Sequence, residues 1–135
     1  MARKLTVAEL LEGKGKVQRS QIFTQNADEA AAAEEAGIDM VITPLPSAKA
    51  IRAAAPNTFL TVGMVGEHAK STESALAAAF EGMATGGDAI YTSASYGKVR
   101  AMADEWIPVV GHVGFVPYRL TWFGKRRAVG KTADE

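Results

Sequence analysis

Three polar residues stand where predicted strands of this sequence end, and their side chains could do acid–base or binding chemistry. His112 lies near the end of the predicted strand 107–113 and is followed by Val113 and Gly114. An imidazole titrates near neutral pH, so it suits proton transfer or a hydrogen bond to a carbonyl. Tyr91 and Ser93 are two residues apart at the end of another run, and alternate strand positions share one face. We therefore expect Tyr91 and Ser93 to hold a carboxylate, and His112 to contact a carbonyl or exchange a proton.

Three further polar residues follow or end predicted strands and are expected to line the same pocket. They are Gln25, Thr43 and Ser47. The basic run 125–127 could meet a phosphate or carboxylate above that pocket, although a solvated loop explains it as well. His112 and Tyr91 also have a structural alternative, because a core His or Tyr with its polar atoms hydrogen-bonded needs no ligand.

Short apolar runs alternate with Ala-rich helical stretches along the chain. Capping signals at Thr6 and Asn26, each with Glu three residues later, predict helix starts. Ser47 is expected to cap a short helix to about Ala55, and Ser71 or Thr72 to begin a longer one that ends near Gly86. The predicted strands are 17–24, 39–43, 58–64, 89–92 and 107–113, and a further helix covers 97–105.

This alternation predicts an α/β fold with a parallel sheet and right-handed crossovers. A complete (β/α)₈ barrel needs about 250 residues, so five strands in 135 residues fit the N-terminal half of one. We expect a single domain over 1–135, with a capping helix in 1–16, βα repeats in 17–113, and a long irregular loop from 114. The loop is expected to end in a further helix start at Thr132. An open flavodoxin-like sheet is disfavoured because no Gly-rich phosphate loop follows the first strand.

Composition limits the classes of partner. Lys plus Arg and Asp plus Glu number 15 each, so no net field attracts nucleic acid or an anionic membrane. There is no Cys, which excludes disulfides and thiolate metal sites. No apolar run reaches the ~20 residues of a membrane span, and the N-terminus does not resemble a signal peptide, so we expect a cytoplasmic protein.

Two stretches resemble the ketopantoate hydroxymethyltransferase family. The first is the capped segment 4–11 followed by Lys-Gly-Lys at 14–16. The second is Pro-Val-Val-Gly-His-Val-Gly at 108–114, with Pro117 and the Phe-Gly pair at 123–124. The resemblance covers this chain and about half of the family's length. It implies a barrel of the phosphoenolpyruvate mutase type, Mg²⁺ and methylenetetrahydrofolate as cofactors, and hydroxymethyl transfer to a 2-oxo acid for pantothenate synthesis.

Several positions depart from the pattern that the resemblance implies. Leu45 and Gly63 stand where the family has metal-binding Asp, and residues 91–93 read Tyr-Thr-Ser in place of Lys-x-Glu. Residues 25–26 read Gln-Asn in place of Tyr-Asp, whereas His112 is retained. Because Mg²⁺ prefers anionic oxygen ligands, we expect no conventional metal site here.

Two functions of different classes remain open. The favoured one is a transferase or C–C lyase that acts on a small carboxylate or 2-oxo acid, with His112, Tyr91 and Ser93 at its centre. The alternative is a non-catalytic homologue that binds a small molecule or assembles with a partner. A half-barrel leaves sheet edges uncovered, so we expect a homo-oligomer or a partner that supplies the rest of the barrel. The remainder could also lie on a longer chain or have been lost.

Overall fold

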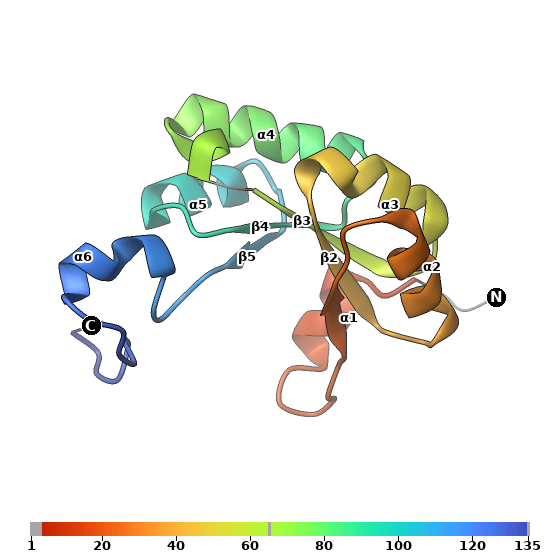
Figure 1. Ribbon diagram of the computed structural model, residues 1–135, viewed down its shortest axis with the longest axis horizontal. Coiled ribbons are helices and arrows are strands. Elements are labelled where there is room, and N and C mark those ends of the chain that lie inside the picture. Colours follow the sequence, from red (N-terminus) through yellow and green to blue (C-terminus); the bar gives the residue numbers. More distant parts are fainter. Residues whose placement is uncertain (1–3, 65, 135) are drawn as a thin grey trace.

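A computed structural model describes residues 4–64 and 66–134, and these residues form one parallel sheet with helices between its strands (Figure 1). The strands follow one another in the sheet in the order of the sequence, β1-β2-β3-β4-β5. They are β1 (Gln21–Phe23), β2 (Met40–Pro44), β3 (Phe59–Gly63), β4 (Ala89–Thr92) and β5 (Val109–Gly111). The predicted parallel α/β fold is confirmed, with one helix in each crossover.

The crossover helices cover one face of the sheet, as right-handed connections require (Figure 1). They are α2 (Ala27–Glu35), α3 (Ala48–Ala54), α4 (Thr72–Ala84) and α5 (Tyr96–Asp104). Helix α1 (Val7–Glu12) lies on the opposite face, where its residues Val7, Leu10 and Leu11 line an apolar hollow with strand residues such as Phe59. No helix within 4–64 or 66–134 is long and apolar enough to cross a bilayer.

Helix caps explain why these helices begin where the sequence predicts. Thr6 accepts a hydrogen bond from the Glu9 backbone N–H, and the Glu9 carboxylate accepts one from the Thr6 backbone, which completes a capping box. Asn26 caps α2, and Ser71 caps α4. Gly37 follows α2 with φ of 75°, a left-handed conformation that glycine adopts at little cost.

Alternation along the strands divides the sheet into a covered face and an open face. Val41, Val62 and Ile90 are fully buried against the helices and belong to the hydrophobic core. Their neighbours in sequence point the other way. On that open face Phe23 is 52% exposed and Val110 is 42% exposed. The open face of the half-barrel therefore presents apolar surface to solvent.

Four expectations from the sequence are corrected. The first strand occupies only 21–23, because β1 is an edge strand that pairs with β2 over three residues. Ser47 does not cap α3 through its side chain, since a 3₁₀ turn over Leu45–Ser47 already leads into the helix. The loop after β5 is partly helical, with a 3₁₀ turn (Pro117–Arg119) and α6 (Leu120–Phe123). Residues 131–134 form bends and a turn rather than a helix start, and Glu135 lies outside the described residues.

A polar network ties together the N-terminal ends of β3 and β4. The Asp88 carboxylate accepts hydrogen bonds from Lys4, Arg52 and the Leu60 backbone. The Arg52 guanidinium also donates to four backbone carbonyl oxygens, those of Ala55, Pro56, Thr58 and Gly86. The Arg52 and Asp88 side chains are each 15% exposed, so solvent screens this ion pair little. No local sequence pattern around Arg52 or Asp88 predicts this network.

Candidate functional site

The C-terminal ends of β4 and β5 bring two predicted site residues to one face. Tyr91 is paired with Val110 in the ladder, and the ladder continues with a 2.9 Å hydrogen bond from the His112 backbone N–H to the Thr92 carbonyl. His112 lies two residues beyond Val110 and so faces the same side of the sheet as Tyr91. That side is the open face of the half-barrel.

The side chains of Tyr91 and His112 form a direct hydrogen bond. The Tyr91 hydroxyl oxygen lies 2.7 Å from His112 Nδ1, and the two rings are tilted by 36° with centroids 5.9 Å apart. Burial raises the pKa of the Tyr91 hydroxyl, so the phenol, neutral at pH 7 in any setting, stays neutral further into the alkaline range. A neutral phenol that donates to Nδ1 leaves the imidazole proton on Nε2. In that tautomer the Tyr91 hydroxyl holds the Nδ1 side of the His112 ring, and Nε2 carries the proton.

The raised pKa of Tyr91 predicts an effect at alkaline pH. The unfolded chain releases the Tyr91 proton at a lower pH than the folded protein does. The contribution of Tyr91 to the free energy of unfolding is therefore complete below pH of about 10 and is lost as pH rises through the raised pKa. We expect the alkaline phenolate absorbance titration to contain a step above the ordinary range that disappears in Tyr91→Phe. The exposed Tyr96→Phe is the matched control and should retain that step. Loss of the step in both variants would contradict the assignment.

An apolar cavity of about 430 Å³ opens beside Tyr91 at the ends of β2 and β3. Its lining residues are Phe23, Ile42, Thr43, Pro44, Gly63, Met64 and Tyr91. A side chain at Gly63 would meet the Thr43 carbonyl at 3.3 Å and the Tyr91 ring at 3.9 Å. The glycine thus leaves room that a larger residue would occupy next to the Tyr91 ring.

The remaining predicted site residues lie around this edge in different settings. Ser93 lies one residue beyond β4, and its carbonyl accepts hydrogen bonds from Tyr118 and Arg119. Thr43 lines the apolar cavity and is fully buried, and its hydroxyl has no hydrogen-bond partner among the described residues. Gln25 is exposed and donates its backbone N–H to Glu29. Ser47 is half-buried in the 3₁₀ turn and lines neither this cavity nor the larger one described next.

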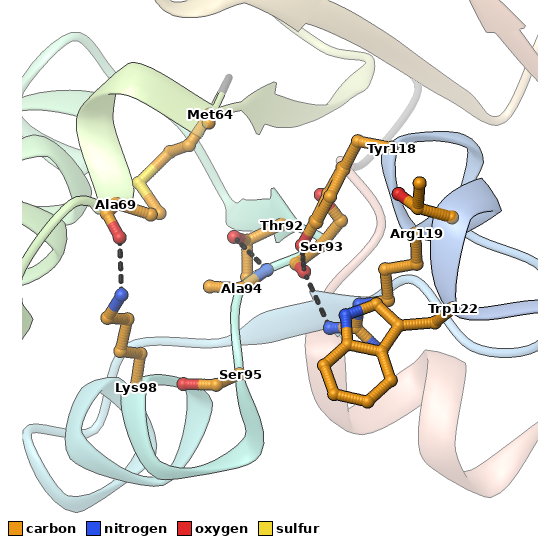
Figure 2. A pocket seen from close by; sticks show the side chains of 12 residues that line it. Met64, Ala69, Thr92, Ser93, Ala94, Ser95, Lys98, Tyr118, Arg119 and Trp122 are labelled. Carbon is orange, nitrogen blue, oxygen red and sulfur yellow. Dashed lines mark hydrogen bonds between the residues drawn. The ribbon is translucent and has the colours of Figure 1, made fainter.

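A larger cavity of about 560 Å³ lies at the same edge between β4, α5 and the segment that contains α6 (Figure 2). Two of its lining residues, Lys98 and Arg119, carry positive charge and were not identified from the sequence. Both follow predicted strands in the chain, Lys98 after β4 and Arg119 after β5. Their position after a predicted strand places them near the functional edge of such a sheet, but it does not distinguish them from other basic residues in the same segments.

The donor atoms at this edge are neutral or basic. Leu45, at a position where the resemblance implies a metal-binding Asp, is buried in the hydrophobic core. Neither of the two cavities has an Asp or Glu among its lining residues. Within 4–64 and 66–134, no group of three or more His, Cys, Asp or Glu side chains could hold a metal ion. The polar groups at this edge are hydroxyl, imidazole, ammonium and guanidinium groups and backbone carbonyls.

The fold and the position of the site define a class of protein. A parallel sheet in sequential order, with its candidate residues at the C-terminal strand ends, is the arrangement of (β/α)₈ barrel enzymes. Solved structures with a similar fold include the 3,6-anhydro-D-galactonate cycloisomerase from Zobellia galactanivorans, a TIM-barrel enzyme. The TM-score is 0.55 at 18% identity, over 69% of this chain and 31% of that one. This likeness concerns the fold alone.

The family model described as ketopantoate hydroxymethyltransferase matches residues 44–135, and the chain belongs to this family. Its relatives include the 3-methyl-2-oxobutanoate hydroxymethyltransferase of Kosmotoga olearia, which is 29% identical over 95% of this chain and 57% of that protein. The enzyme of the same name from Hyperthermus butylicus is 31% identical over 98% of this chain and 55% of its own length. The chain thus spans a little over half the length of these relatives.

Proposed function

We propose that this chain binds a small 2-oxo acid at the C-terminal ends of its strands and activates the C–H bond next to the carbonyl. The reaction would be hydroxymethyl transfer or related C–C bond chemistry on the pantothenate route. The observation that carries the proposal is the 2.7 Å hydrogen bond between Tyr91 and His112 at the edge where barrel enzymes react. Membership of the ketopantoate hydroxymethyltransferase family supports the choice of substrate class.

In the proposed mechanism His112 acts on the carbonyl. The Tyr91 hydroxyl donates to Nδ1 and fixes the orientation of the ring, so Nε2–H points to the ligand side. That N–H donates a hydrogen bond to the 2-oxo group and stabilises the negative charge that develops on its oxygen when a solvent water accepts the neighbouring C–H proton. Tyr91 is thus a positioning residue in this proposal. Ser93 would bind the substrate carboxylate, and Thr43 would form part of the cavity wall, whereas Gln25 and Ser47, which line neither cavity, have no role in this mechanism.

We also propose that the reaction proceeds without a conventional magnesium site. Magnesium binds one or two carboxylates in most protein sites, and neither cavity at this edge is lined by any. Leu45 and Gly63 supply no ligand oxygen from their side chains. The donor set therefore does not fit a Mg²⁺ ion, and the hydrogen bond from His112 takes the place of metal polarisation in this mechanism.

Exchange of the C3 proton tests this function. The chain is mixed with 3-methyl-2-oxobutanoate in D₂O, and loss of the C3–H signal is followed by proton NMR against buffer alone. We expect exchange faster than in buffer, with the same rate in Mg²⁺ and in EDTA. Exchange that requires Mg²⁺ would contradict the metal-free mechanism. The absence of enhanced exchange under both conditions would contradict C–H activation by this chain.

The open face of the sheet supports a second candidate of another class, a non-catalytic assembly or binding protein. Phe23 and Val110 expose apolar surface there, and β1 and β5 have one unpaired edge each among the described residues. Such surface favours association. In this proposal the face is covered by (β/α) units equivalent to those in the remaining length of the relatives. An absence of proton exchange, as defined above, would favour this candidate.

A further inference from the structure

The larger cavity has a surplus of positive charge. Lys98, in the first turn of α5, lies on one side of it, and Arg119 lies on the other beside Trp122 (Figure 2). No Asp or Glu is among the lining residues, and the adjacent Glu67 is exposed outside the cavity. Two cations therefore share a confined space without a counter-ion among the described residues.

The hydrogen bonds of these two cations go to neutral acceptors. Lys98 Nζ donates to the backbone carbonyls of Ala69 and Lys70, and Arg119 donates to the carbonyl of Ser93 at 3.3 Å. The salt bridges within the described residues involve other side chains. A guanidinium or ammonium group gains more from a carboxylate or phosphate than from a carbonyl. Both cations thus keep donor capacity for an anion.

The rest of the lining suits a small anion that carries a flat apolar part. Ser95 precedes α5 but makes no capping hydrogen bond through its side chain, and Thr121 adds a second hydroxyl. Trp122 is 89% exposed overall yet lines the cavity, and Met64 is buried in the wall across from it (Figure 2). Charged, hydroxyl and aromatic groups therefore converge on one space.

We propose that this cavity is a binding site for the carboxylate or phosphate group of a small molecule, with Lys98 and Arg119 as its ligands and Trp122 against the attached apolar part. The site adjoins the first cavity, because Met64 lines both and Ser93 lines this one, but neither Tyr91 nor His112 lines it. Its proposed ligands, Lys98 and Arg119, take no part in the proposed C–H activation. It does not depend on 2-oxo acid chemistry, so either proposal can fail without the other.

Tryptophan fluorescence provides a direct test. The chain has two Trp, and Trp106 is 93% exposed outside the cavity, so Trp106→Phe leaves Trp122 as the reporter. In that background we titrate inorganic phosphate and, separately, malonate, with sodium chloride at matched ionic strength as the reference. A saturable change with phosphate or malonate, but not with chloride, is expected. Saturation by only one of the two anions would identify the preferred group.

Charge variants decide whether the proposed ligands hold the anion. Arg119→Gln and Lys98→Gln are each expected to weaken binding about tenfold or more, because each removes a charge-assisted hydrogen bond. Lys14→Gln is the matched control, since it removes one positive charge at an exposed turn after α1. Circular dichroism confirms that each variant is folded. Equal affinity in Arg119→Gln and the parent, an equal loss in Lys14→Gln, or no saturable change with either anion would overturn the proposal.

Discussion

His112→Ala is expected to slow exchange of the C3 proton of 3-methyl-2-oxobutanoate by about 10²–10³-fold, the usual cost of removing one hydrogen-bond donor from a developing oxyanion. The loss should fall on the exchange rate more than on the substrate concentration needed for half-maximal rate. The reason is that the His112 hydrogen bond strengthens only as charge develops on the carbonyl oxygen. Initial rates by proton NMR over a range of substrate concentrations measure both quantities.

Two tyrosine variants separate the role of the pair from general damage. Tyr91→Phe keeps the ring but removes the hydroxyl that fixes His112, and a loss of about tenfold is expected, the worth of one hydrogen bond. Tyr96→Phe removes the hydroxyl of a side chain that is 81% exposed and should exchange at the parent rate. Parent-like exchange in His112→Ala would refute the assigned role. A Tyr96→Phe loss equal to that of Tyr91→Phe would show that the assay reports stability.

Arg52→Met is expected to lower the free energy of unfolding by about 3 kcal/mol, the lower end of the cost of breaking a buried ion pair, because the half-buried Asp88 keeps Lys4 as its remaining cation. The substitution also removes the donors of four backbone carbonyls at the start of β3 and β4. Urea denaturation followed by circular dichroism should show a lower midpoint with an unchanged dependence on urea concentration.

Arg100→Met is the matched control for the Arg52 variant. Arg100 pairs with Asp104 at 2.9 Å on the surface of α5, and its side chain is 80% exposed. Exposed pairs of this kind are worth about 0.3–0.5 kcal/mol on a helix, so the control should unfold near the parent midpoint. If both variants lose the same small amount of stability, the Arg52–Asp88 network does not hold the sheet as described.

The sequence predicted the sheet well because its strands are signalled locally. The predicted strand 39–43 contains the continuous apolar run 40–42, as in parallel strands covered by helices, and Gly37 and Gly86 end helices with positive φ. The edge strand was overpredicted. Residues 17–20 carry an ordinary strand composition, but only β2 is available to pair with them, and the ladder covers 21–23. The length of an edge strand depends on how many residues of the neighbouring strand can hydrogen-bond to it, and the sequence of the edge segment alone does not contain that information.

The sequence predicted which residues belong to the candidate site, but it did not predict which of their side chains are in contact. His112 and Tyr91 were each identified from their positions at strand ends, whereas their contact depends on the register of β4 against β5, which pairs Tyr91 with Val110. Arg119 donates a hydrogen bond to the carbonyl of Ser93, 26 residues away in the sequence, and no local sequence pattern predicts that contact. Lys98 carries no distinguishing sequence context, because a Lys in a helical first turn is normally solvated.

The Arg52–Asp88 network lies at the N-terminal ends of β3 and β4, whereas the Tyr91–His112 pair lies at the C-terminal ends of β4 and β5, and this division has an evolutionary consequence. Substitutions around the C-terminal strand ends leave the network's hydrogen bonds intact, so new chemistry can be explored there at low risk to folding. Variation at Arg52 or Asp88 has no such freedom. Members of this family that differ in substrate should therefore diverge first in the βα connections, while the lower ends of β3 and β4 keep their charges.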